Sequence, residues 1–207
     1  MRPRGPALAA AALALALAGC GGGSSGRSDS ASTATTARTT PAPRPAAPER
    51  NEPPARLPRG WQLVVDKPGG FSFGVPRGWH AHRVGSGELV RSVDKALAIS
   101  VSYDRSAAAR TLDLRTYASR TAHALRGYRD LSVATAHRIP GQRHPTVTVQ
   151  ARGVFLRTHV RQSILVVAVR RPQRGTFSVI AVRSANTRAV RYAPEITELV
   201  NTLRTRK

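Results

Sequence analysis

The chain contains little cysteine, few aromatic residues and few acidic side chains. Its 207 residues include one cysteine, Cys20, which excludes a disulfide within the chain. Aromatic residues make up 5% of the chain, too few for an obvious surface on which nucleic-acid bases could stack. Eleven acidic residues stand against 33 basic ones, and no pair of carboxylates stands out as a general acid and base. These shortages leave no motif for a disulfide scaffold or a two-carboxylate hydrolase.

The excess of positive charge admits two interpretations. The formal net charge is +22, and only Lys67, Lys95 and Lys207 among the basic residues are lysines. With the abundant alanine, glycine and proline, this bias toward arginine is typical of GC-rich coding, which would scatter arginines over a solvated surface. The other interpretation is a positive field that attracts an anionic partner.

The first twenty residues have the layout of a secretory signal peptide. Arg2 and Arg4 precede an apolar run over residues 7–18. As a helix this run would rise about 18 Å, which is short of the ~30 Å hydrocarbon core of a bilayer. We therefore expect residues 1–19 to be removed as a signal peptide rather than retained as a membrane span.

The end of the apolar run is typical of a lipid-modification site. Leu17, Ala18, Gly19 and Cys20 resemble the lipobox of bacterial lipoproteins, whose cysteine receives a diacylglyceryl group and becomes the first mature residue. An ordinary signal peptide with a chance cysteine is the alternative. Because two or three acyl chains suffice for stable anchoring, the lipobox predicts a protein tethered to the outer, extracytoplasmic face of the cell membrane. Nucleic acid is a poor candidate partner there.

Residues 20–60 have the composition of a tether. Glycine and serine follow Cys20, and seven prolines lie between Pro41 and Pro58. Leu57 is the only large apolar residue between positions 21 and 60, so no core can form there and we expect a disordered or extended spacer. The P-x-P spacings would also allow docking into an aromatic groove.

Residues 61–207 have the pattern of a single α+β domain in which helices cover an antiparallel sheet. Apolar and polar residues alternate over 147–155, which predicts a strand with one buried face. Residues 164–169 and 177–182 are continuously apolar, as in central strands, and turn residues between them predict a hairpin. Residues 89–103 predict a further pair of strands.

Two segments have the helical period of apolar residues. The first is expected to begin at Thr111 as its N-cap and to stop at Gly127. The second contains Pro194 in its first turn, and Arg204 and Arg206 are expected at its C-terminal end, where the helix dipole favours cations.

The domain resembles a known fold family. The segment FSFGVPRGW at residues 71–79 resembles the opening strand and turn of the PsbP-like superfamily, and the order of strands and helices that follows is similar too. Many actinobacterial lipoproteins look like this. The resemblance covers nearly all of residues 61–207 and implies a PsbP-like α/β/α sandwich with a binding or accessory role. The superfamily shares no catalytic residues that could be carried over.

No motif for catalysis or for a cofactor stands out. His80 and His82 would face the same side of a strand, but no third ligand for a metal can be named. The sequence Gly85-Ser86-Gly87 departs from the G-x-S-x-G nucleophile elbow and is interpreted as a turn. We expect no metal and no cofactor. An envelope hydrolase or other enzyme with an unrecognised site stays as the alternative function.

A group of arginines is the candidate binding site. Residues 61–207 carry 25 basic and eight acidic side chains, an excess of 17 positive charges. The candidate anion-binding edge consists of Arg157, Arg161, Arg170, Arg171 and Arg174. Arg157 and Arg161 are expected to share a strand face, and the other three flank the predicted hairpin turn. Because arginine suits bidentate binding of phosphate or carboxylate, the expected partner is an anionic lipid, an acidic wall polymer or an acidic protein.

Replacing Cys20 with alanine tests the lipobox. The Cys20→Ala variant lacks the thiol that accepts the lipid, so lipid labelling should be abolished and the protein should leave the membrane fraction. Metabolic labelling with a tagged fatty acid, followed by membrane fractionation, measures both effects. A variant that stays membrane-bound through residues 7–18 would show that the lipoprotein prediction is wrong.

Overall fold

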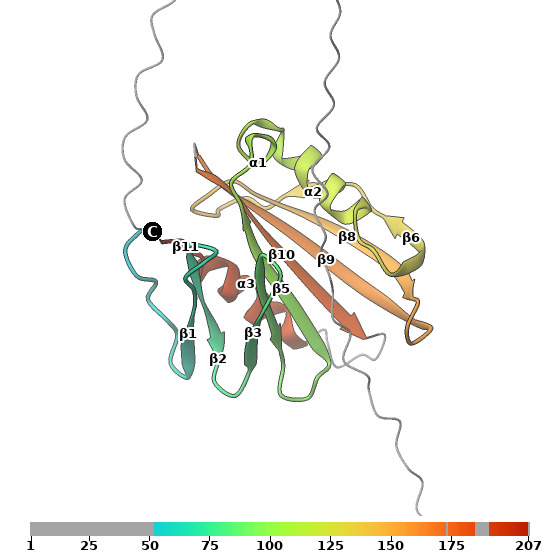
Figure 1. Ribbon diagram of the computed structural model, residues 1–207, viewed down its shortest axis with the longest axis horizontal. Helices are drawn as coiled ribbons and strands as arrows, with labels where there is room; N and C mark the ends of the chain where they lie inside the picture. Colours follow the sequence, from blue (N-terminus) through green and yellow to red (C-terminus); the bar gives the residue numbers. More distant parts are fainter. Residues whose placement is uncertain (1–51, 173, 185–190, 207) are drawn as a thin grey trace, which may run out of the picture.

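The computed structural model describes residues 52–172, 174–184 and 191–206 (Figure 1). Leu17, Ala18, Gly19 and Cys20 lie outside the described residues, as do the rest of the predicted signal peptide and the tether up to residue 51. Within the described ranges, no helix is long and apolar enough to cross a membrane.

A large antiparallel sheet forms the centre of the fold. Its strands lie in the order β3 (His80–Val84), β4 (Gly87–Arg91), β5 (Leu97–Asp104), β10 (Gly175–Ser184), β9 (Val160–Arg171), β8 (Thr146–Phe155) and β6 (Tyr128–Val133), and β7 (His137–Arg138) also pairs with β8. The predicted central hairpin is confirmed, since Val179 of β10 lies opposite Val167 of β9. The predicted pairing of the strands within residues 89–103 is confirmed by β4 and β5.

A second, smaller sheet lies beside the large one. It consists of β1 (Trp61–Asp66), β2 (Phe71–Pro76) and β11 (Arg204–Thr205). Phe71 and Phe73 of β2 are fully buried, and the Phe71 ring packs edge-on against Phe177 of β10 at a centroid distance of 5.9 Å. The opening strand therefore joins the small sheet to the core under the large one.

Apolar side chains divide into two cores, one on each face of the large sheet. Strand β9 serves both, because Val167 and Val169 join the core beneath α3 (Ala193–Thr202) and β2, whereas Ile164 and Val166 join the core beneath α2 (Leu114–His123). In Figure 1, α2 lies along β8 and β9. Helix α1 (Ala107–Thr111) packs against β10, where the Thr176 hydroxyl donates to the Ala109 carbonyl. Successive residues of a strand point to opposite faces, so the continuous apolar run of β9 is the consequence of burial on both sides.

The first predicted helix is wrong at its N-terminus. It is divided into α1 and α2, and Asp113 rather than Thr111 is the N-cap of α2, where its carboxylate accepts hydrogen bonds from the backbone N–H groups of Arg115 and Thr116. The Thr111 hydroxyl instead donates to the Ala107 carbonyl at 2.9 Å. Thr111 is thus the last residue of α1, and its hydroxyl bonds back to the first turn of that helix instead of capping α2.

The second predicted helix ends earlier than expected. Its apolar stripe is buried, but Leu203 is the C-cap and Arg204 already belongs to β11, where it lies opposite Ser72. Arg206 follows β11, and its side chain donates a hydrogen bond to Ser72 Oγ at 2.8 Å. The placement at the helix C-terminus is therefore wrong for Arg206. It is confirmed for the side chain of Arg204, which directly follows the C-cap and donates to the Asn201 carbonyl in the last turn of α3 at 2.9 Å.

The packed fold begins before residue 61. The Glu52 backbone N–H donates to the Thr205 carbonyl at 3.2 Å, and the Thr205 N–H donates to Glu52 Oε2 at 3.0 Å. Leu57 lies against Gly74, and the side chain that glycine lacks would meet its Cδ2 at 2.6 Å. Packing therefore includes residues before the predicted position 61, from Glu52 onward.

Aspartate substitutions at Val149 and Val167 test the two cores. Each side chain is at most 3% exposed, and each lies in a different core. Burying an unpaired carboxylate there should lower the free energy of unfolding by more than ~3 kcal/mol, measured by denaturant titration. Val93→Asp is the matched control, since Val93 is 66% exposed and should tolerate the change. Wild-type stability in both core variants would contradict the two-core arrangement.

Candidate anion-binding sites

The predicted five-arginine edge is divided between two ends of the molecule. Arg161 and Arg170 are nine residues apart on β9, which at about 3.3 Å per residue separates them by roughly 30 Å. Arg157 lies in the turn between β8 and β9, so it does not share a strand face with Arg161. The prediction of one continuous basic edge is wrong, because β9 is 12 residues long, twice the apolar run from which it was inferred.

At the far end of β9, the arginines are part of the fold. Arg170 donates to the backbone carbonyls of Arg110 at 3.0 Å and Leu112 at 2.7 Å. These two hydrogen bonds connect the turn between α1 and α2 to the sheet. Arg174 donates to Thr205 Oγ1 at 3.1 Å. These guanidinium groups therefore already have acceptors within the protein.

A different set of arginines shares one open face of the sheet. Arg152 of β8 and Arg183 of β10 both lie opposite Ser163 of β9, so the three residues form a row across neighbouring strands. Arg161 is two residues from Ser163 and therefore lies on the same face. Arg129 of β6 lies opposite Val154, two residues from Arg152, and also shares that face. We call Arg129, Arg152, Arg161 and Arg183 the arginine face.

Two members of the arginine face, Arg152 and Arg183, line a shallow hollow. The hollow has a volume of about 210 Å³, and its lining also includes Gln150, Ser163 and the apolar Leu165. The core beneath α3 includes Val167 and its neighbours farther along β9, and the hollow lies beyond that covered part of the same face. The site is thus an open hollow with polar and apolar walls.

The positive charge of the arginine face has no compensating carboxylate among the described residues. The ion pairs in these ranges join Arg83 to Asp66, Arg171 to Glu52 and Arg191 to Asp94, and none involves the arginine face. The Arg183 Nε is buried and has no hydrogen-bond partner in the described part of the chain. A buried donor without an acceptor lowers the stability of the fold, and an anion that accepts a hydrogen bond from it removes that penalty.

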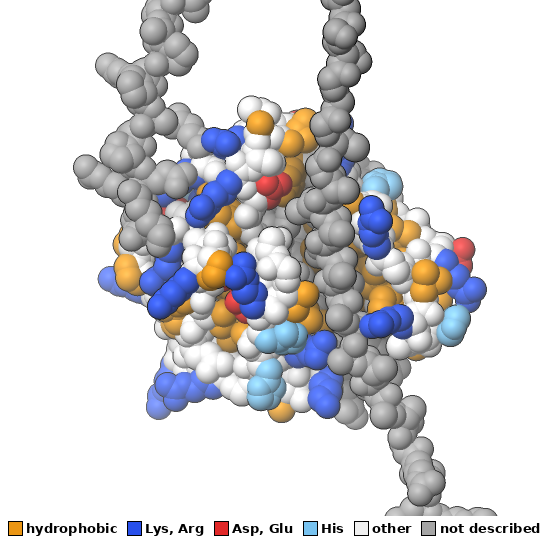
Figure 2. All heavy atoms as spheres, viewed as in Figure 1, with side chains coloured by type: hydrophobic (Ala, Val, Ile, Leu, Met, Phe, Trp, Pro, Cys, Tyr) orange, Lys and Arg blue, Asp and Glu red, His pale blue; other side chains and the backbone are white. Residues whose placement is uncertain are grey.

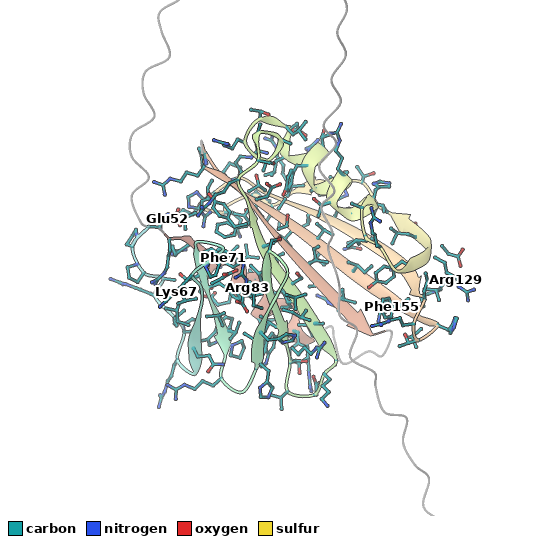
Figure 3. All side chains as sticks on the ribbon, in the orientation of Figure 1. Glu52, Lys67, Phe71, Arg83, Arg129 and Phe155 are labelled. Atoms are coloured by element: carbon teal, nitrogen blue, oxygen red, sulfur yellow. The ribbon has the colours of Figure 1, made fainter. Side chains whose placement is uncertain are left out.

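A second cluster lies at the other end of the sheet, around Arg171. Its side chain is 2% exposed, and its Nε lies 3.1 Å from Glu52 Oε1. Arg171 Nη2 donates to the Leu203 carbonyl at 2.6 Å, and the guanidinium stands over the Phe177 ring at 5.3 Å. Figure 3 shows Glu52 and Arg129 at opposite ends of the molecule, so the Arg171 cluster and the arginine face are separate sites.

The other residues singled out in the sequence do not assemble into a metal site. His80 and His82 are exposed on β3, opposite Arg91 and Leu89. No group of three or more metal-ligating side chains occurs in the ranges that the structure describes. The interpretation of this segment as a turn is confirmed for Gly85 and Ser86, which connect β3 to β4, whereas Gly87 is the first residue of β4.

Sequence comparison identifies no relative, but structural comparison identifies the fold. No family model and no curated protein matches the chain. Cyanobacterial PsbP (CyanoP) from Synechocystis sp. PCC 6803 is similar over 70% of this chain and 92% of its own, with 17% identity and a TM-score of 0.51. The Ran-binding protein Mog1p of Saccharomyces cerevisiae is similar over 69% of this chain and 94% of its own, with 12% identity and a TM-score of 0.49. The predicted PsbP-like α+β fold is confirmed.

Three members of the arginine face were missed by the sequence analysis. None of Arg129, Arg152 and Arg183 is singled out there. The four arginines are spread over 55 positions, from 129 to 183, and only the strand register brings them together. Alternation in single strands could place each side chain on a face but could not align the strands.

His144 should make stability depend on pH. Burial is the main cause that lowers the pKa of His144 from 6.5 to about 4, and the positive charge of Arg171 is the second. The carboxylate of Glu52 opposes this shift. Between these values the unfolded chain takes up a proton that the folded protein does not, so stability should fall as the pH drops from 6.5 to 4. Thermal unfolding across this range should show a smaller decline for His144→Gln than for the wild type. Equal declines would mean that His144 titrates normally.

Proposed function

We propose that the protein is a binding or accessory module, anchored through Cys20 at the outer face of the cell membrane, that holds phosphate groups of an anionic envelope component. The row of Arg152, Ser163 and Arg183 carries this proposal, because one arginine lies on each side of the serine. Neither arginine forms an ion pair with a described carboxylate. The lipobox supports the location, and the PsbP-like fold commonly serves as a binding module.

The spacing of the arginines suits a ligand with several anionic groups. Arg152 and Arg183 lie two strands apart, about 10 Å at the usual separation of paired strands. Guanidinium groups bind phosphate through paired N–H donors. A surface with four of them can therefore engage more than one phosphate at a time.

The role that we propose is binding without catalysis. Arginine stays protonated at neutral pH and is a donor only, so it holds an anion but does not exchange protons with it. The hollow between Arg152 and Arg183 is open and only partly apolar, whereas substrate sites are commonly enclosed and largely apolar. Protein and wall-polymer ligands fit such an open face.

The turn between β8 and β9 favours a lipid headgroup as one source of phosphate. Leu156 is 48% exposed and Val160 is 39% exposed, and Arg157 and Arg161 lie beside them in the sequence. Apolar side chains flanked by cations are typical of segments that insert into the headgroup region of an anionic membrane. A phosphate-containing wall polymer offers the same chemistry without an apolar phase.

Charge reversal on the arginine face tests the proposed function. Arg152 and Arg161 are both exposed, so Arg152→Glu/Arg161→Glu should leave the fold intact. The double variant should bind phosphatidylglycerol vesicles and soluble poly(glycerol phosphate) at least about tenfold more weakly, since charge-assisted hydrogen bonds contribute ~1.5–3 kcal/mol each. Cosedimentation and titration calorimetry with the chain from residue 21 onward measure the two ligands.

Arg115→Glu/Arg120→Glu on α2 is the matched control. Both side chains are exposed, and the change in net charge is the same. Equal losses from the two double variants would mean diffuse attraction to an arginine-rich surface, consistent with the dispersed basic side chains in Figure 2. Loss for vesicles alone identifies the lipid headgroup as the phosphate source, and loss for the soluble polymer alone identifies the wall.

A further inference from the structure

A small hollow separates the C-terminal end of α3 from the loop that precedes β8. Its volume is about 30 Å³, and its lining includes Arg143, His144, Arg171, Asn201 and Arg204. A single water molecule needs roughly 10–15 Å³ of such space, so the hollow has room for more than one oxygen atom of a small ligand. Its lining is rich in hydrogen-bond donors.

Two of the arginines in this hollow have buried donors without acceptors. Arg171 is only 2% exposed, and its Nη1 has no hydrogen-bond partner among the described residues. Arg204 Nη1 donates to the Asn201 and Leu203 carbonyls at 2.9 and 2.7 Å, but its buried Nε has no partner there either. Since native proteins satisfy nearly all buried polar groups, these donors indicate a missing acceptor.

The charge around the hollow is unbalanced. The guanidinium groups of Arg143, Arg171 and Arg204 line the hollow, and Glu52 is the one carboxylate in the described ranges that acts on Arg171 and Arg204. Burial lowers the pKa of Arg171 and of Arg204, and in each case Glu52 opposes the shift. Burial also keeps His144 neutral at neutral pH. An acceptor that carries negative charge therefore fits this environment better than water does.

We propose that this hollow binds a small oxyanion, with phosphate as the representative ligand, between Arg171 and Arg204. Arg171 and Arg204 supply guanidinium donors from the wall of the hollow, and Arg143 contributes charge from the exposed rim. The site is independent of the proposed function, because the arginine face lies at the other end of β9.

Glu52 competes with the anion for the charge of Arg171. Its Oε1 lies 3.1 Å from Arg171 Nε, so an oxyanion on Nη1 would share one guanidinium with a carboxylate. Like charges at this separation repel. Removing the carboxylate should therefore strengthen binding of the anion, an effect that a purely structural role of the cluster does not produce.

Titration with inorganic phosphate at constant ionic strength tests the proposal. The full-length protein in a neutral detergent should bind phosphate saturably, and chloride should not replace it. Arg204→Gln and Arg143→Gln should each weaken binding at least about threefold, and Glu52→Gln should strengthen it by a similar factor, as expected for partly exposed charges. Arg143 is exposed, so its variant still decides the question if Arg204→Gln does not fold.

The pKa of His144 provides a second measurement. A bound anion should raise the pKa of His144 from about 4 toward its ordinary value, which NMR of the imidazole follows directly.

Arg138→Gln is the matched control, because Arg138 is exposed on β7 and does not line the hollow. The absence of saturable binding, equal replacement by chloride, or an unchanged affinity in both Arg143→Gln and Glu52→Gln would overturn the proposal. Arg152→Glu/Arg161→Glu should bind phosphate here normally, so failure of one site is distinguishable from failure of the other.

Discussion

Burial of both faces of β9 and β10 is the constraint on which the rest of the structure depends. Val167 and Val179 face one core and Val166 and Ile180 face the other, so neither strand can shift by one residue without exchanging its two sets of side chains. The register of the central hairpin is thereby fixed. Because β5 and β8 pair with its two sides, their registers are fixed through it. The row of Arg152, Ser163 and Arg183 is a direct consequence of this alignment.

The sequence predicts the strands and helices themselves better than it predicts their ends and the contacts between them. The apolar runs that became β9 and β10, and the stripe from Ile196 to Leu203, follow from periodicity, which is a local property. The exceptions are at element ends. Asp113 replaced Thr111 as the cap because Thr111 ends the short helix α1, where its hydroxyl bonds to the Ala107 carbonyl. Arg204 entered a strand because of a tertiary contact, its pairing with Ser72 of β2.

The candidate sites illustrate the same limit. Arg157, Arg161 and Arg171 are close in the sequence, but one lies in a turn, one on an open face and one in a buried ion pair. Residue type and spacing cannot distinguish these environments. Partners such as Glu52 and Arg183 come from distant parts of the chain, and only the complete fold brings them into place.

The contact between Glu52 and Thr205 also determines how the fold would respond to mechanical force. A pull on the chain ahead of Glu52 reaches first its backbone hydrogen bond to Thr205 and its ion pair with Arg171, at a strand of only two residues. Few hydrogen bonds hold that strand, so β11 and the segment around Leu57 should detach before β2 and the long hairpin bear any load. We therefore expect the region around Glu52 to unfold locally under force while the two cores stay intact.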